Sequence, residues 1–151
     1  MKELAKIIRV ARGHMQADLV LRNARIVNVF SAEVHEGDIA ILGERIVGIG
    51  DYTGKKEIDL ERGFVLPGLI DGHMHLESTM VKVQEFARAV VPRGTTSVIC
   101  DPHEIANVHG IEGIHYILNS SKFSPVNIFV MLSSCVPATN FETSGAHLRG
   151  F

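Results

Sequence analysis

The sequence predicts an α/β protein, with a small β-sandwich-like unit followed by the first part of a parallel (β/α)8 barrel. Short alternating β-type runs fill residues 18–66, whereas near-continuous apolar strands alternate with helices after Pro67. Such strands are typical of a parallel sheet that is covered on both faces. All three apolar strands end in polar residues, where parallel α/β folds place their sites. We therefore expect two parts, residues 1–66 and 67–151.

The first part is predicted to open with a helix, because apolar side chains recur at helical spacing near the N-terminus. Short strands with turn signals follow. The expected elements are a helix at 2–11, a strand at 18–29, a hairpin at 37–50 that turns at Gly43 and Glu44, and short strands at 57–60 and 64–66.

The second part is predicted to alternate strands and helices. A barrel needs about 250 residues, so a chain of 151 residues is expected to be the front part of a longer protein and, isolated, to aggregate, oligomerise or bind metal weakly. The expected elements are strands at 68–75, 95–101 and 126–132, a helix at 80–91 capped by Ser78 or Thr79 and ended by residues 92–94, and a helix at 108–119 with Ile111, Ile114, Ile117 and Leu118 inward.

Composition and charge exclude several classes of protein. Apolar residues make up 46% of the chain, which is enough for a core, and the formal net charge is −2 with both signs interspersed. No basic stripe favours nucleic acid, no apolar run is long enough to span a membrane, and residues 1–17 lack a secretory signal. Cys100 and Cys135 lie in apolar runs, as reduced cysteines of a cytoplasmic protein do. We expect no nucleic-acid or membrane partner.

The stretch LPGLIDGHMHLEST, residues 66–79, contains the strongest signal for chemistry. His73 and His75 are one residue apart at a strand end, and residues i and i+2 of a strand point to the same face. Two imidazoles on one face make half of a metal site. The alternative is a pair of hydrogen-bonded histidines at a strand end. The preceding PGLID run and the following acid favour metal ligation.

Two carboxylates flank this pair. Glu77 shares the face of the histidines if the strand geometry persists, and could hold substrate or a hydrogen bond to a ligand. An ordinary carboxylate in the first turn of the next helix explains Glu77 equally well. For Asp71 we expect a structural hydrogen bond.

The run DPHE follows the second apolar strand of the predicted barrel. Asp101, His103 and Glu104 are expected to form a loop that contacts substrate or metal, since Pro102 favours an extended backbone before it. A helix start capped by Asp101 or Asn107 is the alternative. The HExxH zinc motif is excluded because Asn107 occupies its fifth position. For His109 and His115 we expect surface or packing roles.

These motifs carry a family resemblance. The run PGLIDGHMH after a β-rich leader resembles the amidohydrolase superfamily, whose metal-binding HxH pair ends the first barrel strand. DPHEIANV at 101–108 and SCVPAT at 134–139 are similar to the adenine deaminases of that superfamily. The resemblance implies a (β/α)8 metallo-hydrolase barrel after a composite β-sandwich, cytoplasmic location, a homo-oligomer of the full-length protein, and hydrolysis of adenine to hypoxanthine and ammonia in purine salvage.

The resemblance also implies site residues and a cofactor. It assigns a divalent metal, binuclear with manganese or iron and with zinc as an alternative, to His73 and His75. It makes Glu77, Asp101, His103 and Glu104 part of the substrate-binding wall. A bridging carboxylate, two further histidines and a last-strand aspartate of that family do not occur in this chain, so the proton shuttle has no assigned residue. The 151-residue chain alone is expected to be inactive.

Two other interpretations of the function remain open. One is an amidohydrolase that opens a cyclic amide, like a dihydroorotase or hydantoinase. Those enzymes often carry an arginine two residues after the second histidine, where this chain has Glu77. A cationic group there suits a carboxylate substrate, whereas a carboxylate suits a purine N–H. The other reading is a truncated, non-catalytic binding or assembly module.

Overall fold

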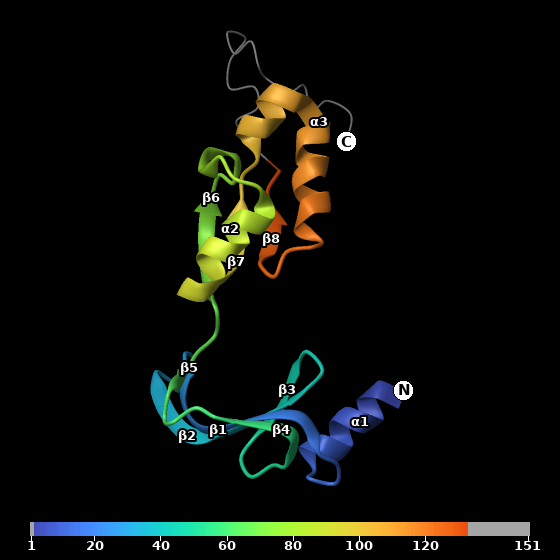
Figure 1. The fold of residues 1–151 in the computed structure, drawn as a ribbon, viewed down its shortest axis with the longest axis vertical. Helices are drawn as coiled ribbons and strands as arrows, with labels where there is room; N and C mark the ends of the chain where they lie inside the picture. Colours follow the sequence, from blue (N-terminus) through green and yellow to red (C-terminus); the bar gives the residue numbers. More distant parts are fainter. Residues whose placement is uncertain (1, 133–151) are drawn as a thin grey trace. The chain divides into compact units, whose positions relative to one another are not determined.

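The computed structural model describes residues 2–132. The chain divides into two compact units, Met1–Pro67 and Gly68–Phe151, and each is described by itself. Figure 1 colours them along the sequence, from the blue N-terminal helix to the orange strand β8. Among residues 2–132, no helix is both long and apolar enough to cross a membrane.

The first unit consists of one helix and one five-stranded sheet, with strand order β3-β2-β1-β4 and β5 beside β1. The β2–β3 hairpin confirms the predicted turn, where Gly43 has a φ of 58° that suits glycine. One face of the sheet is apolar and lines a groove at Ile26, Ile39 and Ile49. The elements are α1 (Lys2–Ala11), β1 (Ala17–Asn28), β2 (Glu33–Leu42), β3 (Arg45–Ile49), β4 (Gly54–Asp59) and β5 (Phe64–Val65).

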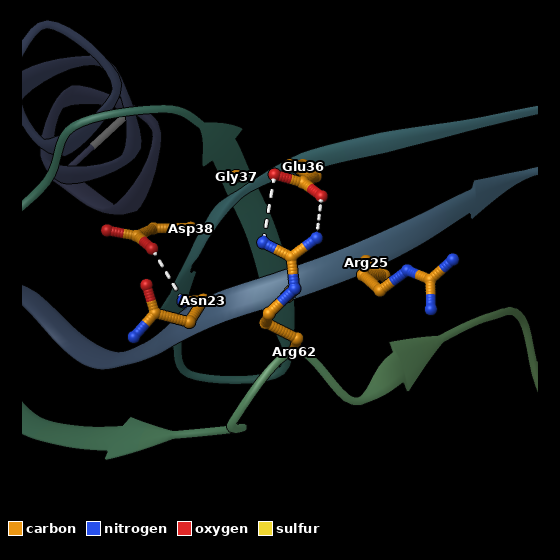
Figure 2. Close-up of a pocket in the computed structure, with 7 residues that line it drawn as sticks. Asn23, Arg25, Glu36, Gly37, Asp38 and Arg62 are labelled. Atoms are coloured by element: carbon orange, nitrogen blue, oxygen red, sulfur yellow. Dashed lines mark hydrogen bonds and ion pairs between the residues drawn. The ribbon is translucent and has the colours of Figure 1, made fainter.

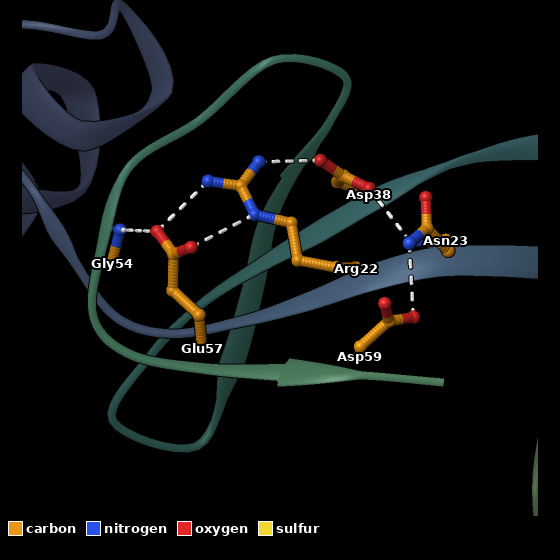
Figure 3. Close-up of polar contacts among 6 residues, drawn as sticks. All are labelled: Arg22, Asn23, Asp38, Gly54, Glu57 and Asp59. Carbon is orange, nitrogen blue, oxygen red and sulfur yellow. Dashed lines mark hydrogen bonds and ion pairs between the residues drawn. The ribbon is translucent and has the colours of Figure 1, made fainter. Parts of the chain in front are cut away.

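A bulge in β1 is held by polar side chains (Figure 3). The pairing of β1 with β2 shifts register between Leu21 and Ala24, and Asn23 there has a φ of 55°. Arg22 lies 2.5 Å from a carboxylate oxygen of Asp38 on β2 and 2.8 Å from one of Glu57 on β4. The Asn23 amide N–H donates to the other Asp38 oxygen at 2.9 Å. Ion pairs and hydrogen bonds therefore join three strands where the regular ladder is interrupted.

The second unit contains a three-stranded sheet in the order β6-β7-β8, and both pairings are parallel. The near-continuous apolar strands predicted this arrangement correctly. The elements are β6 (Leu69–Met74), the 3-10 helix η1 (Glu77–Thr79), α2 (Val83–Val90), the 3-10 helix η2 (Val91–Arg93), β7 (Thr95–Cys100), α3 (His103–Ser121) and β8 (Asn127–Val130).

The core of this unit lies between the sheet and its two α-helices. Val83, Phe86 and Ala87 of α2 are buried, as their helical spacing predicts. The buried cluster also takes in residues from β7, α3 and the segment before β8, and its members are Leu76, Val83, Phe86, Ala87, Val98, Cys100, Ile117 and Val126. This packing fixes the carboxyl ends of β6 and β7, where the candidate site lies.

The start of α2 differs from the prediction. Neither Ser78 nor Thr79 caps the helix, because both lie in η1 and the N-cap is Lys82, without a side-chain hydrogen bond. The Thr79 hydroxyl instead donates to the backbone oxygen of Leu76. A separate 3-10 turn therefore occupies the connection after β6.

The second helix also differs from the prediction, which placed it at 108–119. The helix α3 begins five residues earlier, at His103, and contains a non-helical residue, Gly110, with φ 63° and ψ −151°. Ile117 is buried as expected, whereas Leu118 is 40% exposed and was wrongly placed inward. The DPHE run is thus the entry to a helix rather than an open loop.

Candidate metal centre

The two histidines of the HMH run lie together at the end of β6. His73 belongs to the strand, but the strand ends at Met74, so His75 lies just beyond it. The expectation that both residues share one regular strand is therefore wrong for His75. Their rings nevertheless meet edge to face, with centroids 5.1 Å apart and planes at 83°. Two imidazoles are thus side by side, although not through ideal strand alternation.

A backbone contact orients His75. Its Nδ1 lies 2.9 Å from the backbone oxygen of Asp101, and a carbonyl oxygen can only accept a hydrogen bond. Nδ1 therefore carries the proton and donates it, which leaves the lone pair on Nε2. A backbone carbonyl that fixes the tautomer in this way is typical of histidines that bind metal ions.

Asp101 brings a carboxylate to the pair. It immediately follows β7 and is only 7% exposed. Ligand atoms of His73, His75 and Asp101 lie within 4.8 Å of one another. One Asp101 oxygen is also 3.3 Å from Nδ1 of His103. The ends of two neighbouring parallel strands thus supply two imidazoles and a carboxylate.

A second group of possible ligands overlaps the first. His75, His103 and Glu104 also offer atoms within 4.8 Å of one another. The rings of His75 and His103 lie 4.6 Å apart at 77°. Since Nδ1 of His75 is engaged, its Nε2 can serve only one of the two groups at a time.

Glu77 and Ser78 connect η1 to the first turn of α3. The Ile105 amide donates to Oε1 of Glu77 at 3.0 Å, and the Ser78 hydroxyl donates to Oε1 of Glu104 at 2.6 Å. The other Glu77 oxygen, Oε2, is buried and accepts no hydrogen bond from the described residues. A buried carboxylate oxygen without a donor costs free energy unless a ligand or water supplies one.

The donor set fits a divalent metal ion. Imidazole nitrogen and carboxylate oxygen suit zinc, iron and manganese, and neutral imidazole is the form that binds. The proton position on His75 and the buried carboxylate of Asp101 meet that requirement. Asp71 has the structural hydrogen bond expected of it, accepting from the His73 amide at 3.1 Å.

The remaining histidines of α3 belong to neither group. His109 is exposed, and His115 lies 3.8 Å from Glu112 one turn earlier on the same helix. The contacts of Ser78 and of the Ile105 amide had no signal in the sequence, because they join residues more than 25 positions apart. The SCVPAT motif and Cys135 lie outside the described residues.

A polar pocket in the first unit has a structural explanation (Figure 2). It is lined by Asn23, Glu36, Asp38 and Arg62, among others. Arg62 forms an ion pair with Glu36, and the Asn23 amide is hydrogen-bonded to Asp38. Both carboxylates of this pocket, Glu36 and Asp38, are therefore already paired with arginines, and the bulge in β1 accounts for its position.

Comparison with known proteins places these residues in context. The model of the Amidohydrolase family matches residues 64–150. The chain is 59% identical over 142 residues to an adenine deaminase from Clostridium acetobutylicum, and 58% identical over 143 residues to one from Kosmotoga olearia. Each match covers 94% of this chain but 25% of the relative, so the chain spans about a quarter of the length of these curated relatives.

Solved structures share the fold. The L-hydantoinase from Arthrobacter aurescens superposes with a TM-score of 0.62 at 19% identity, over 76% of this chain and 27% of that one. An atrazine chlorohydrolase from Arthrobacter aurescens TC1, solved with zinc and atraton, gives 0.61 at 21% identity, over 78% and 36%. Together with the family match, these likenesses confirm the predicted fold class.

Proposed function

The chain belongs to the amidohydrolase family, and on that premise we propose that it supplies the first metal ligands and part of the substrate wall of an adenine deaminase. The reaction is the hydrolysis of adenine to hypoxanthine and ammonia. The observation that carries the proposal is the meeting of His73, His75 and Asp101 at the ends of β6 and β7. Identities of 59% and 58% to adenine deaminases support the choice of substrate.

The family implies a divalent metal, and His73 and His75 are the residues that we propose to hold it. A divalent ion bound there would supply an activated water at neutral pH, because it would lower the pKa of that water to about 7. We propose a binuclear centre with manganese or iron, and zinc as the alternative. The Asp101 carbonyl holds the His75 ring with Nε2 available, so the ligand is oriented before a metal binds.

The wall of the site is proposed to consist of Glu77, Asp101, His103 and Glu104. Burial of Glu77 Oε2 without a donor supports a substrate contact, because a purine N–H offers the donor that this oxygen lacks. Carboxylates in the wall also disfavour an anionic cyclic amide through charge repulsion. No residue of this chain is assigned to proton transfer.

Organisation and location are further parts of the proposal. Residues 1–66 are taken to form part of a composite β-sandwich, which the apolar groove at Ile26 and Ile39 supports. Residues 67–151 are taken to begin the barrel. A role in purine salvage, a cytoplasmic location and a homo-oligomer of the whole protein follow from the likeness to adenine deaminases.

Metal content and turnover test this proposal in the complete protein. His73→Ala and His75→Ala should each lose at least one metal ion by elemental analysis and abolish ammonia release from adenine. His109→Ala is the matched control, since this histidine is exposed and outside both ligand groups. Wild-type metal content in both site variants would refute the proposed ligands.

Substrate comparison separates the rival functions. The complete protein should release ammonia from adenine and leave dihydroorotate and hydantoin intact. Turnover of either cyclic amide without turnover of adenine would assign the protein to the cyclic-amide enzymes. A folded, metal-free protein that acts on none of the three would be a binding module instead.

A further inference from the structure

The first turn of α3 has no cap of its own. Its N-cap residue is Pro102, which makes no side-chain capping hydrogen bond. The first intrahelical bond runs from the Ala106 amide to the Pro102 oxygen at 3.0 Å, which leaves the earlier amides of the turn without helical partners. One of these, the Ile105 amide, donates to the Glu77 carboxylate at 3.0 Å. Glu77, which lies 28 positions earlier in the chain, thus caps the first turn of α3.

Ser78 adds a second link beside the first. Its hydroxyl donates to the Glu104 carboxylate at 2.6 Å. Two consecutive residues of η1 therefore hold two consecutive residues of α3. The segment that carries both links begins two residues after His75.

The break at Gly110 makes these links necessary. With φ 63° and ψ −151°, this residue separates the segment His103–His109, which contains the first turn, from the longer part of α3. The longer part packs in the core through Ile117. The regular helical hydrogen bonds do not continue through such a residue. The position of the first turn is therefore set by packing and by hydrogen bonds to other segments rather than by continuous helical hydrogen bonding.

We propose that Glu77 and Ser78 are positioning residues, which hold the first turn of α3 so that His103 stays against His75 and Glu104 stays beside them. The His75–His103 ring distance of 4.6 Å is the geometry that they maintain. The consequence for catalysis rests on the proposed function, whereas the structural consequence does not. Loss of outer contacts of this kind typically lowers metal affinity or activity about 10-fold to 100-fold.

Hydrogen–deuterium exchange of the complete protein tests the structural step without metal or adenine. Glu77→Ala removes the acceptor of the Ile105 amide, and faster exchange is expected in the peptide that covers residues 103–106. Glu77→Gln keeps an acceptor oxygen and should retain most of the protection. Unchanged exchange in Glu77→Ala, or an equal loss in both variants, would overturn the capping assignment.

The pair Ser78→Ala and Ser78→Thr isolates positioning from substrate contact, because Ser78 has no proposed contact with substrate. Ser78→Ala should lower kcat for adenine or the affinity for metal about 10-fold, with a smaller change in KM. Ser78→Thr keeps the hydroxyl and should restore both.

The outcomes distinguish this inference from the proposed function. Faster exchange in Ser78→Ala with wild-type kcat, KM and metal affinity would overturn the positioning role and leave the proposed function intact. Metal retention in His73→Ala and His75→Ala would overturn the proposed function, while the exchange comparison would still decide how the turn is held. Equal thermal stability of the Ala and Thr variants would exclude a general folding defect.

Discussion

Gly113 lies so close to Ile105 that an ideal Cβ on the glycine would be 2.8 Å from the Ile105 backbone oxygen. Gly113 is buried in the longer part of α3, and Ile105 is in the first turn. The approach is therefore a contact between the two parts of the helix on either side of Gly110. Ile105, whose amide N–H donates to the Glu77 carboxylate, is thus also in contact with the core of the second unit.

Gly113→Ala should destabilise the second unit, although glycine to alanine in a helix ordinarily stabilises by about 1 kcal/mol. The added methyl meets backbone atoms, which cannot move aside cheaply, so the expected loss is about 1–3 kcal/mol. Urea unfolding measures it. Gly72→Ala is the control, since nothing lies within 4 Å of its Cβ position. Equal stability of the two variants would contradict the close contact.

Arg22→Met should lower the melting temperature of the first unit at pH 7. The variant leaves the carboxylates of Asp38 and Glu57 without the guanidinium that neutralises both. Arg88→Met is the control, because its pair with Glu85 is exposed and such pairs contribute little. Calorimetry compares the two, and an equal effect of both would show that the bulge network does not stabilise the sheet.

The effect of Arg22→Met should depend on pH. Hydrogen bonding from Arg22 lowers the pKa of Glu57 below its usual value near 4.5. Burial opposes ionisation of Asp38, but hydrogen bonds from Arg22 and the Asn23 amide outweigh it and lower that pKa below 3.8.

A depressed carboxylate pKa contributes stability that is complete above the unfolded pKa and is lost as pH falls through the folded pKa. The difference in melting temperature between wild type and Arg22→Met should therefore be full above about pH 5 and shrink toward pH 2. Melting curves across this range measure it. A difference that stays constant with pH would exclude the carboxylates as its source.

Cys100 should be unreactive in the folded protein. Burial raises the pKa of its thiol to about 11, so the nucleophilic thiolate is scarce at neutral pH. Iodoacetamide at pH 8 should leave the peptide that contains Cys100 unmodified, and should alkylate it after unfolding in urea. Mass spectrometry of the digested protein reports both states. Rapid labelling of the folded protein would contradict the burial of this residue.

The sequence predicts the parallel sheet well because that arrangement depends on local composition. The runs at β7 and β8 are apolar and rich in β-branched residues, which suits strands covered on both faces. The start of α3 was missed for a local reason as well. The prediction assigned the DPHE run to a loop, although proline is tolerated at a helix start and α3 begins directly after Pro102.

The candidate site was predictable only in part. The spacing of His73 and His75 indicates that their rings lie together, and they do. The hydrogen bond from His75 to the Asp101 carbonyl has no such signal, because it depends on how the end of β6 lies beside β7. The pairing of β6 with β7 shifts register between Asp71 and Met74, and no local sequence pattern encodes that shift. The links from Glu77 and Ser78 to α3 likewise require the folded sheet.

The non-helical residue Gly110 ends a short segment in which the exposed residues Val108 and His109 can be changed without repacking the core. Residues 104–109 follow His103 and end at a glycine that already interrupts the helix. Sequence libraries confined to Glu104 and residues 107–109 can alter the surface of this segment while keeping Ile105, which packs against the core cluster, and Ala106, which is buried. Such libraries should therefore vary residues 104 and 107–109, with Ile105, Ala106, Gly110 and Gly113 kept fixed.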